Sequence, residues 1–258
     1  MENGSSNTYV FESEKVAEDE MNWDAYAEHY DVMCDMNPSY QENIKKLIRY
    51  LDTWQVPENP RICDLGAGTG NYIVALAKHL PNAQFVHVDF DAKMNEQAKS
   101  KYEKSGIQNV QILNQQVQQV SFEDDSFDII ICINALYAIS PQVDVLKKVH
   151  KWLRPDGRFF VIDFGRKQKT LDWTIYLFKE SLKRNQLGRY FKALKDSREI
   201  IKQNRQTSKG QDSGRYWLHS TAEFNSTLRE SGFTVDEVFP CYRGYSDLAV
   251  CRKSTDTD

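Results

Sequence analysis

The segment Asp64-Leu65-Gly66-Ala67-Gly68-Thr69-Gly70 decides the fold class of this chain. It follows the short apolar segment 61–63 and precedes the apolar run 72–77, an order that predicts a strand, a glycine turn and a helix. Because glycine has no Cβ and tolerates positive φ, such a turn brings the backbone close to a ligand. The first turn of the helix leaves backbone N–H groups available to bind that ligand.

A regular alternation of strands and helices continues after this turn. The apolar patterns predict strands over 62–65, 84–90, 110–114, 127–134 and 158–164, helices over 71–80, 92–104 and 143–152, and a turn over 155–157. A helix over 221–231, capped by Ser220, precedes two last strands, 233–240 and 248–252. The pattern is typical of an α/β fold, with a parallel sheet and helices on both faces.

Composition and periodicity divide the chain into five segments. We predict a disordered acidic leader (1–21), an N-terminal helical lid (22–60), a ligand-binding core (61–165), a helical cap inserted after the fifth strand (166–214), and a C-terminal part with one helix and the last two strands of the core (215–258). Within the lid, apolar spacing predicts helices over 23–35 and 40–54. The cap differs from the core because long helical patterns replace the strands.

Length and composition fit one soluble α/β domain. The chain has 258 residues, of which 40% are hydrophobic and 27% are charged. It contains no run of about 20 apolar residues that could span a membrane, and its first residues lack the basic and apolar regions of a secretory signal. The five cysteines form no CxxC pair, which favours reduced cysteines in a cytoplasmic protein over a metal site or a disulfide framework.

The net charge of −4 hides an uneven distribution along the chain. The segment 166–209 carries thirteen Lys and Arg residues against four Asp and Glu residues. A basic segment on an acidic body can face an anionic substrate, nucleic acid or a membrane, and it can equally be a solvated helical face. The sequence leaves these interpretations open.

Three residues around the glycine turn indicate the kind of ligand. A dinucleotide-binding GxGxxG turn would need its third glycine at position 71, which is Asn71. Asp64 stands two residues before the first glycine, where its carboxylate would repel a pyrophosphate but would suit a ligand that carries an ammonium group. Asp89, 19 residues after Gly70, ends the second predicted strand, where an acid can accept hydrogen bonds from both ribose hydroxyls.

On these residues the chain resembles the class I S-adenosylmethionine-dependent methyltransferases. The resemblance is carried by the glycine turn and by four further motifs, namely VDFDAKM (88–94), FEDDSFD (122–128), LRPDGR (153–158) and WDAYAEHYD (23–31). It extends over about 22–165 and more loosely to 252. It implies a Rossmann-like sheet of seven strands, six parallel and the last antiparallel, and it implies S-adenosyl-L-methionine as the cofactor.

The resemblance also implies a set of cofactor-binding residues. In the glycine turn, Asp64, Gly66, Ala67 and Gly68 would lie under the methionine and sugar of the cofactor. Asp89 would bind the ribose, and Phe90 and Met94 would flank the adenine. Asn134 would lie near the transferred methyl, and Tyr30 would close the site. Gln116, next to Val117, stands where the family often has an aspartate that binds the adenine amino group. A glutamine oxygen can still accept that hydrogen bond.

Methyl transfer is an in-line displacement, so we expect the enzyme to act mainly by alignment and desolvation. A general base is needed only for a protonated, weakly acidic nucleophile. Our candidate catalytic residues are His219 and Tyr137, and our candidate substrate-binding residues are Tyr26, Tyr137, Tyr176, Trp217 and Tyr242. No proline follows Asn134, which argues against methylation of an adenine amino group.

The sequence therefore predicts a methyltransferase that acts on a small molecule. One alternative is a methyltransferase of RNA or protein that docks through the basic segment 166–209. A second is a protein that binds S-adenosylmethionine without catalysis. A nicotinamide-dependent oxidoreductase is disfavoured by Asp64 and Asn71.

Overall fold

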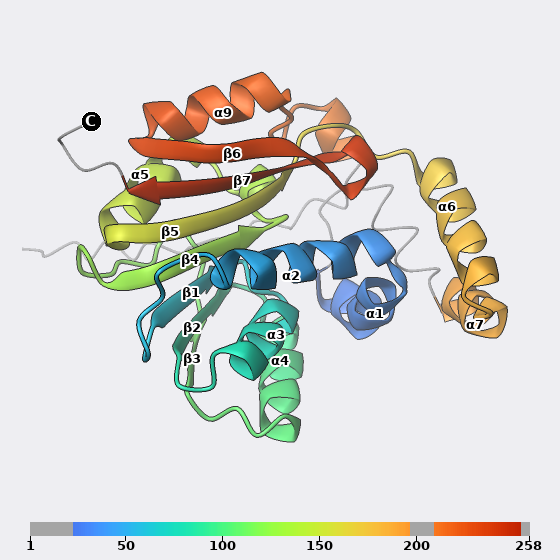
Figure 1. The fold of residues 1–258 in the computed structure, drawn as a ribbon. Coiled ribbons are helices and arrows are strands. Elements are labelled where there is room, and N and C mark those ends of the chain that lie inside the picture. Colours follow the sequence, from blue (N-terminus) through green and yellow to red (C-terminus); the bar gives the residue numbers. More distant parts are fainter. Residues whose placement is uncertain (1–22, 197–208, 254–258) are drawn as a thin grey trace, which may run out of the picture.

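A seven-stranded sheet forms the centre of the molecule (Figure 1). The computed structural model describes residues 23–196 and 209–253. The strand order is β3-β2-β1-β4-β5-β7-β6, and β7 is antiparallel to both of its neighbours while the other pairs are parallel. The strands are β1 (Arg61–Leu65), β2 (Gln84–Asp89), β3 (Val110–Asn114), β4 (Phe127–Ile133), β5 (Leu153–Phe164), β6 (Phe233–Cys241) and β7 (Ser246–Lys253). The predicted fold class is confirmed.

Helices cover both faces of the sheet (Figure 1). Their bounds are α1 (Trp23–Met36), α2 (Pro38–Leu51), α3 (Asn71–His79), α4 (Ala92–Lys104), α5 (Gln142–Trp152), α6 (Thr170–Lys183), α7 (Leu187–Asp196) and α9 (Thr221–Glu230), with short 3-10 turns η1 (Leu136–Ala138) and η2 (Tyr242–Gly244). Two apolar clusters result, one with α5 and α9 and the other with α2, α3 and α4. Alternate residues of β4 enter the two clusters, as its continuous apolar sequence predicts.

Two helix starts follow from their capping residues. The Asn37 side chain accepts a hydrogen bond from the backbone N–H of Ser39 at 3.0 Å, and Pro38 occupies the first turn, so α2 begins two residues before the predicted start. Ser220 and Glu223 form a reciprocal capping box at the start of α9, which confirms the predicted cap.

The fifth strand begins earlier than the apolar pattern predicts. Leu153 already pairs with Phe127, and after a shift of register Arg158 pairs with Ile129. The predicted turn over 155–157 is therefore an irregularity inside β5, and Asp156 within it has φ +62°. Periodicity misses such pairing because the irregular residues interrupt the apolar run.

The segments predicted as lid and cap lie beside the carboxyl ends of the parallel strands. In the lid segment, α1 packs against α4, whereas α2 enters the core, where Leu47 and Leu51 are buried. In the cap segment, α6 and α7 form an arm that extends from the end of β5 (Figure 1). The predicted leader 1–21 lies outside the described residues. Within the described residues, no helix is long and apolar enough to cross a membrane.

The contribution of β4 to stability is testable at Ile130, which is fully buried against the α5 side of the sheet. We expect Ile130→Ala to lower the free energy of unfolding by about 2–5 kcal/mol and Ile130→Val by about 0.5–1.5 kcal/mol, because the lost contacts grow with the deleted volume. Urea unfolding measures both values. Equal losses for the two variants would contradict tight packing at this position.

Candidate functional site

The glycine turn after β1 is shaped by close contacts at two of its three glycines. Gly66, Gly68 and Gly70 have φ of +70°, +54° and +75°. A Cβ on Gly66 would overlap the side chain of Ala135, and a Cβ on Gly70 would overlap the Tyr102 hydroxyl. A Cβ on Gly68 would meet no atom within 4 Å. Gly66 and Gly70 therefore serve close packing, while Gly68 leaves open space beside the turn.

Two carboxylates lie next to this turn at the ends of β1 and β2. Asp89 accepts hydrogen bonds from the backbone N–H of Gly68 at 2.8 Å and from that of Asp91 at 2.9 Å. Burial raises the pKa of Asp89, although these bonds act against the shift. Burial and the nearby Asp89 charge raise the pKa of Asp64 well above its usual value. No Lys or Arg of the described residues forms an ion pair with Asp64, so this buried group suits a cationic ligand atom.

A buried hydrogen-bond network holds the end of β2. The two ring nitrogens of His87 lie 2.8 Å from the Tyr102 hydroxyl and 2.8 Å from the Asn95 side-chain oxygen. Asn95 donates to the backbone oxygen of Asp89 at 3.0 Å and to Asn114 at 2.8 Å. Burial lowers the pKa of His87 to about 4, so the ring stays neutral at physiological pH. This network fixes Asp89 and also positions Tyr102 against Gly70.

Asp31 attaches the first helix to the glycine turn. Its Oδ1 accepts hydrogen bonds from Thr69 at 2.6 Å and from Asn71 at 3.0 Å, and it forms an ion pair with Lys101 at 2.8 Å. Sequence reasoning assigned no role to Asp31, although it directly follows the predicted cofactor residue Tyr30. Tyr30 itself is half-buried and packs against the core on the α2 side. The first helix is thus tied to the turn beside the predicted cofactor site.

The residues predicted to bind the adenine gather where β2 and β3 end. Phe90 is 51% exposed, whereas Met94 and Val117 are buried. Gln116 is exposed, and the backbone N–H of the preceding residue, Gln115, donates to the Asp89 backbone oxygen at 3.1 Å. An exposed ring beside buried apolar side chains offers a face on which a flat ring can stack.

Four polar side chains lie close together beyond the end of β4 and carry unsatisfied atoms. These atoms are the Asn43 amide nitrogen, the Tyr72 and Tyr242 hydroxyls and the Asn134 amide oxygen. None has a partner in good hydrogen-bond geometry within the described part of the chain, although the Tyr242 hydroxyl lies near the side chains of the other three residues. The side chains of Asn43, Tyr72 and Tyr242 are at least nine-tenths buried. The Tyr242 hydroxyl is near enough to Asn43 and Asn134 for both amides to lower its pKa, but burial dominates and raises it. We call Asn43, Tyr72, Asn134 and Tyr242 the neutral polar cluster.

The neutral polar cluster was only partly predicted. Asn134 and Tyr242 were named from sequence, and their positive φ values of +52° and +45° mark unusual backbone at both positions. Asn43 and Tyr72 were missed because they lie on amphipathic helices, where their polarity resembles that of surface residues. Tyr72 follows the glycine turn by two residues, which is the one local signal that could have drawn attention to it.

The predicted substrate residue Tyr176 belongs to a group that joins α6 to the β6–β7 connection. The Arg243 guanidinium lies over the Tyr176 ring, 4.4 Å from its centre, and binds both carboxylate oxygens of Asp172 at 2.8 and 3.0 Å. Tyr245 donates to the same carboxylate at 2.8 Å. On its other side, the Tyr176 hydroxyl lies 3.5 Å from Ser39 of α2. Tyr176 is therefore placed beside the lid segment.

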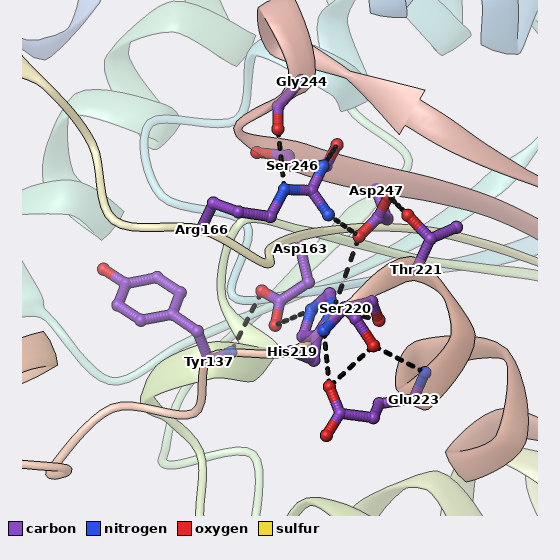
Figure 2. Close-up of polar contacts among 10 residues, drawn as sticks. All are labelled: Tyr137, Asp163, Arg166, His219, Ser220, Thr221, Glu223, Gly244, Ser246 and Asp247. Carbon is purple, nitrogen blue, oxygen red and sulfur yellow. Dashed lines mark hydrogen bonds and ion pairs between the residues drawn. The ribbon is translucent and has the colours of Figure 1, made fainter.

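His219 lies inside a chain of buried charges (Figure 2). Its Nε2 is 3.8 Å from Asp163 and its Nδ1 is 3.4 Å from Asp247, and all three side chains are completely buried. Asp247 also binds Arg166 and accepts a hydrogen bond from Thr221 at 2.7 Å. Burial acts to lower the pKa of His219, but the two carboxylates outweigh it and raise the pKa to about 8.

Two other predicted site residues, Tyr137 and Trp217, lie next to this group of charged side chains. Asp163 accepts a hydrogen bond from the backbone N–H of Tyr137 at 3.0 Å, and the buried Tyr137 ring packs against Phe164 and Tyr216. Trp217 packs against His219 and belongs to the apolar cluster of α5 and α9. It therefore lies in a different cluster from Tyr242, so the structure does not bring all the predicted substrate residues together. The side chain of Tyr26 lies outside the described ones.

Comparison with known proteins identifies the family. A family model described as "Methyltransferase domain" matches residues 57–224, more than half of the chain. The chain belongs to this methyltransferase family. The match includes the glycine turn, Asp89 and Asn134, and it confirms the predicted resemblance and the predicted enzyme class.

Three relatives show how far the likeness of this methyltransferase extends. Demethylmenaquinone methyltransferase of Lactobacillus johnsonii is 28% identical over 207 residues, which cover 79% of this chain and 77% of the relative. The uncharacterized methyltransferase YcgJ of Bacillus subtilis is 33% identical over 103 residues, 40% of each chain. The solved structure of a SAM-dependent methyltransferase from Aquifex aeolicus has a TM-score of 0.55 and 17% identity, with 83% of this chain and 98% of that chain covered. The last comparison supports the fold.

The buried histidine makes the stability of the methyltransferase depend on pH. Because the pKa of His219 is raised from 6.5 to about 8, its stabilising charge is present below pH 6.5 and is lost as the pH rises through about 8. We expect the free energy of unfolding to fall by about 1–2 kcal/mol across this range. Denaturant unfolding at a series of pH values measures the change.

The control is His219→Gln, which should abolish most of this decline. Where that variant does not fold, the NMR titration of the wild-type His219 ring should show a midpoint near pH 8. A ring that titrates at or below 6.5 would refute the assignment.

Proposed function

We propose that this enzyme transfers a methyl group from S-adenosylmethionine to an uncharged small molecule. The observation that carries the proposal is the position of the neutral polar cluster. Asn134 belongs to the cluster, and the neighbouring Ala135 lies against the glycine turn on which the cofactor would bind. A cofactor on the turn would thus be next to an acceptor on the cluster, as in-line transfer requires.

The residues around the glycine turn fit S-adenosylmethionine. The open space at Gly68 leaves room for the cofactor, and Asp89 has carboxylate oxygens for the ribose hydroxyls. Asp64 would stabilise the ammonium group of the methionine part, because its buried carboxylate has no cationic neighbour among the described residues. When bound, the cofactor supplies an electrophilic methyl group on a sulfonium.

The chemistry of the neutral polar cluster supports an acceptor with polar oxygen or nitrogen atoms and no charge. Burial raises the pKa of Tyr72 and of Tyr242, so both hydroxyls stay protonated and can donate hydrogen bonds. Asn43 offers an amide donor and Asn134 an amide acceptor. A charged acceptor would find no opposite charge among these four side chains. An uncharged O–H or N–H acceptor that gains the methyl group must also lose a proton, which solvent would take up, and the three donors would stabilise the negative charge that develops on an acceptor oxygen as this proton leaves.

We assign alignment, rather than proton transfer, to His219 and Tyr137. His219 is completely buried between two carboxylates, and Asp163 holds the backbone of Tyr137 in the connection that follows Asn134. Asp31 would hold the first helix over the turn and keep water from the cofactor. These contacts support a mechanism in which the chain orients two reactants in a dry site.

A labelling experiment tests the proposal. The enzyme is incubated with methyl-labelled S-adenosylmethionine and, separately, with the small-molecule, RNA and protein fractions of a cell extract. The expected result is label in the small-molecule fraction, and at limiting cofactor concentration the control Asp89→Ala should transfer less label because it binds the cofactor more weakly. Label only in RNA or protein would replace the proposal with the docking alternative, and cofactor binding without transfer to any fraction would indicate a binding protein.

The ribose contact can be measured at Asp89. Asp89→Ala should weaken binding of S-adenosylhomocysteine by about 1–3 kcal/mol, because charge-assisted hydrogen bonds are lost. Asp89→Asn keeps one acceptor oxygen and should lose less. Isothermal titration calorimetry gives both affinities, and an unchanged affinity of the alanine variant would remove Asp89 from the site.

The proposed contact of Tyr242 with the acceptor can be tested separately from cofactor binding. With the acceptor identified by the labelling experiment, Tyr242→Phe should lower kcat/KM by about 5–100-fold, because a buried polar partner is lost. Its affinity for S-adenosylhomocysteine should change less than about twofold, since the proposal assigns the Tyr242 hydroxyl to the acceptor and not to the cofactor. Tyr190→Phe removes a hydroxyl that donates to the Thr174 backbone in the arm, and it serves as the control. Equal effects of the two variants would argue against Tyr242.

A further inference from the structure

Exposed apolar side chains concentrate on the arm formed by α6 and α7. Among the described residues, seven large hydrophobic side chains are exposed, and five of them lie on this arm. Leu171, Ile175, Phe178 and Leu182 follow one another along α6 and are 73%, 47%, 39% and 56% exposed, and Phe191 on α7 is 58% exposed. Their spacing of four, three and four residues places the α6 members on one side of the helix. We call these five residues the apolar stripe.

The four α6 residues of the apolar stripe face away from the body of the protein. Trp173 and Tyr176 lie on the opposite side of α6, where they contact Arg243 and Ser39. Figure 1 shows the arm at the edge of the molecule, beyond the helices that cover the sheet. Tyr190 holds the two helices of the arm together, because its ring packs against Phe178 and its hydroxyl donates to the Thr174 backbone oxygen at 3.2 Å. A flat surface can therefore meet the stripe without disturbing the fold.

Positive charge borders the apolar stripe. Within 170–192 the arm has five Lys and Arg residues, all exposed, against two acidic residues. Both acids are paired, Asp172 with Arg243 and Glu180 with Lys183 and Arg184. The remaining cations, Lys179, Arg189 and Lys192, form no ion pair with a carboxylate of the described residues. Lys179 lies about 100° from Phe178 around α6, and Lys192 lies about 100° from Phe191 around α7, so these two cations border the stripe, whereas Arg189 lies on the opposite side of α7 from Phe191.

We propose that the α6–α7 arm docks onto anionic lipid bilayers, with the apolar stripe entering the headgroup region. An amphipathic helix of this composition lies in the interface plane, since its apolar side leaves water while its cations meet lipid phosphates. The same cations oppose a second copy of the chain, because two arms would bring like charges together. The stripe is a row of protruding side chains on an outer helix, which suits a deformable bilayer. The proposal goes beyond the methyl-transfer function and does not depend on it.

Vesicle sedimentation tests the proposal. The full chain is mixed with phosphatidylcholine vesicles and with vesicles that also contain phosphatidylglycerol, at equal total lipid. The wild-type protein should sediment with the anionic vesicles, at least about tenfold more than with the neutral ones, and rising NaCl should weaken this binding. Absence of binding to the anionic vesicles, or equal binding to both kinds, would overturn the proposal.

Two double variants test the apolar and the ionic contributions to vesicle binding separately. Leu171→Gln/Leu182→Gln and Lys179→Gln/Lys192→Gln should each lower the vesicle partition coefficient by about tenfold, because one removes apolar contacts and the other removes charge. Lys104→Gln/Lys147→Gln removes the same charge from exposed positions on α4 and α5, and its binding should change less than about twofold. An equal loss in that control would show that net charge, and not the arm, determines binding.

The oligomeric state gives an independent check. Size-exclusion chromatography with light scattering should give a lipid-free mass that does not change between wild type and Leu171→Gln/Leu182→Gln. A wild-type dimer that the leucine substitutions dissociate would show that the stripe binds a second copy, and this outcome would overturn the lipid proposal. Circular dichroism confirms that each variant is folded, which is expected because the substituted side chains are exposed.

Discussion

The close approach of three backbone segments at the glycine turn is the constraint on which the site depends. The turn after β1 lies against Ala135 after β4 and against Tyr102 of α4, with no room for a side chain at Gly66 or Gly70. The backbone N–H groups of Gly66 and Ala67 are also bonded to the Val88 backbone oxygen of β2. The turn is thus packed from two directions and hydrogen-bonded from a third. Small residues at these positions allow the ends of β1, β2 and β4 to approach one another closely.

The polar groups around the turn are arranged by the same close packing. Asp31 joins the first helix to the turn and to α4, and the network of His87, Asn95 and Tyr102 fixes the end of β2 beneath Asp89. These groups are satisfied within the protein, unlike those of the neutral polar cluster. The support around the turn is thus internally hydrogen-bonded, whereas the neutral polar cluster carries the buried polar atoms that we propose to bind the acceptor. The inner side of the α6–α7 arm contacts α1 and the β6–β7 connection, whereas its stripe is exposed to solvent and therefore has a separate explanation.

Most of the fold could be predicted because it follows from local patterns. The seven strands and the capping of α9 at Ser220 were recognisable from periodicity and from residues with strong positional preferences. The early start of β5 could not be predicted from the apolar pattern, because Leu153 belongs to the strand only through its pairing with Phe127. Apart from Tyr30, the predicted cofactor residues lie at or after the ends of β1, β2, β3 and β4 in sequence, so motif spacing predicts that they lie at the carboxyl edge of the parallel sheet. Trp217 lies elsewhere because side-chain direction depends on tertiary packing.

The sequence by itself determined the strand–turn–helix unit, the acids at the ends of β1 and β2, and the methyltransferase family, because each depends on residue types at fixed spacing along the chain. Tertiary structure alone decided that Asn43 and Tyr72 join Asn134 and Tyr242, that His219 is enclosed by two carboxylates, and that five apolar side chains of the arm remain exposed. These features depend on which distant segments pack together. The apolar periodicity of a helix predicts which of its sides is suited to burial. It does not predict which neighbouring element covers that side, or whether any element covers it.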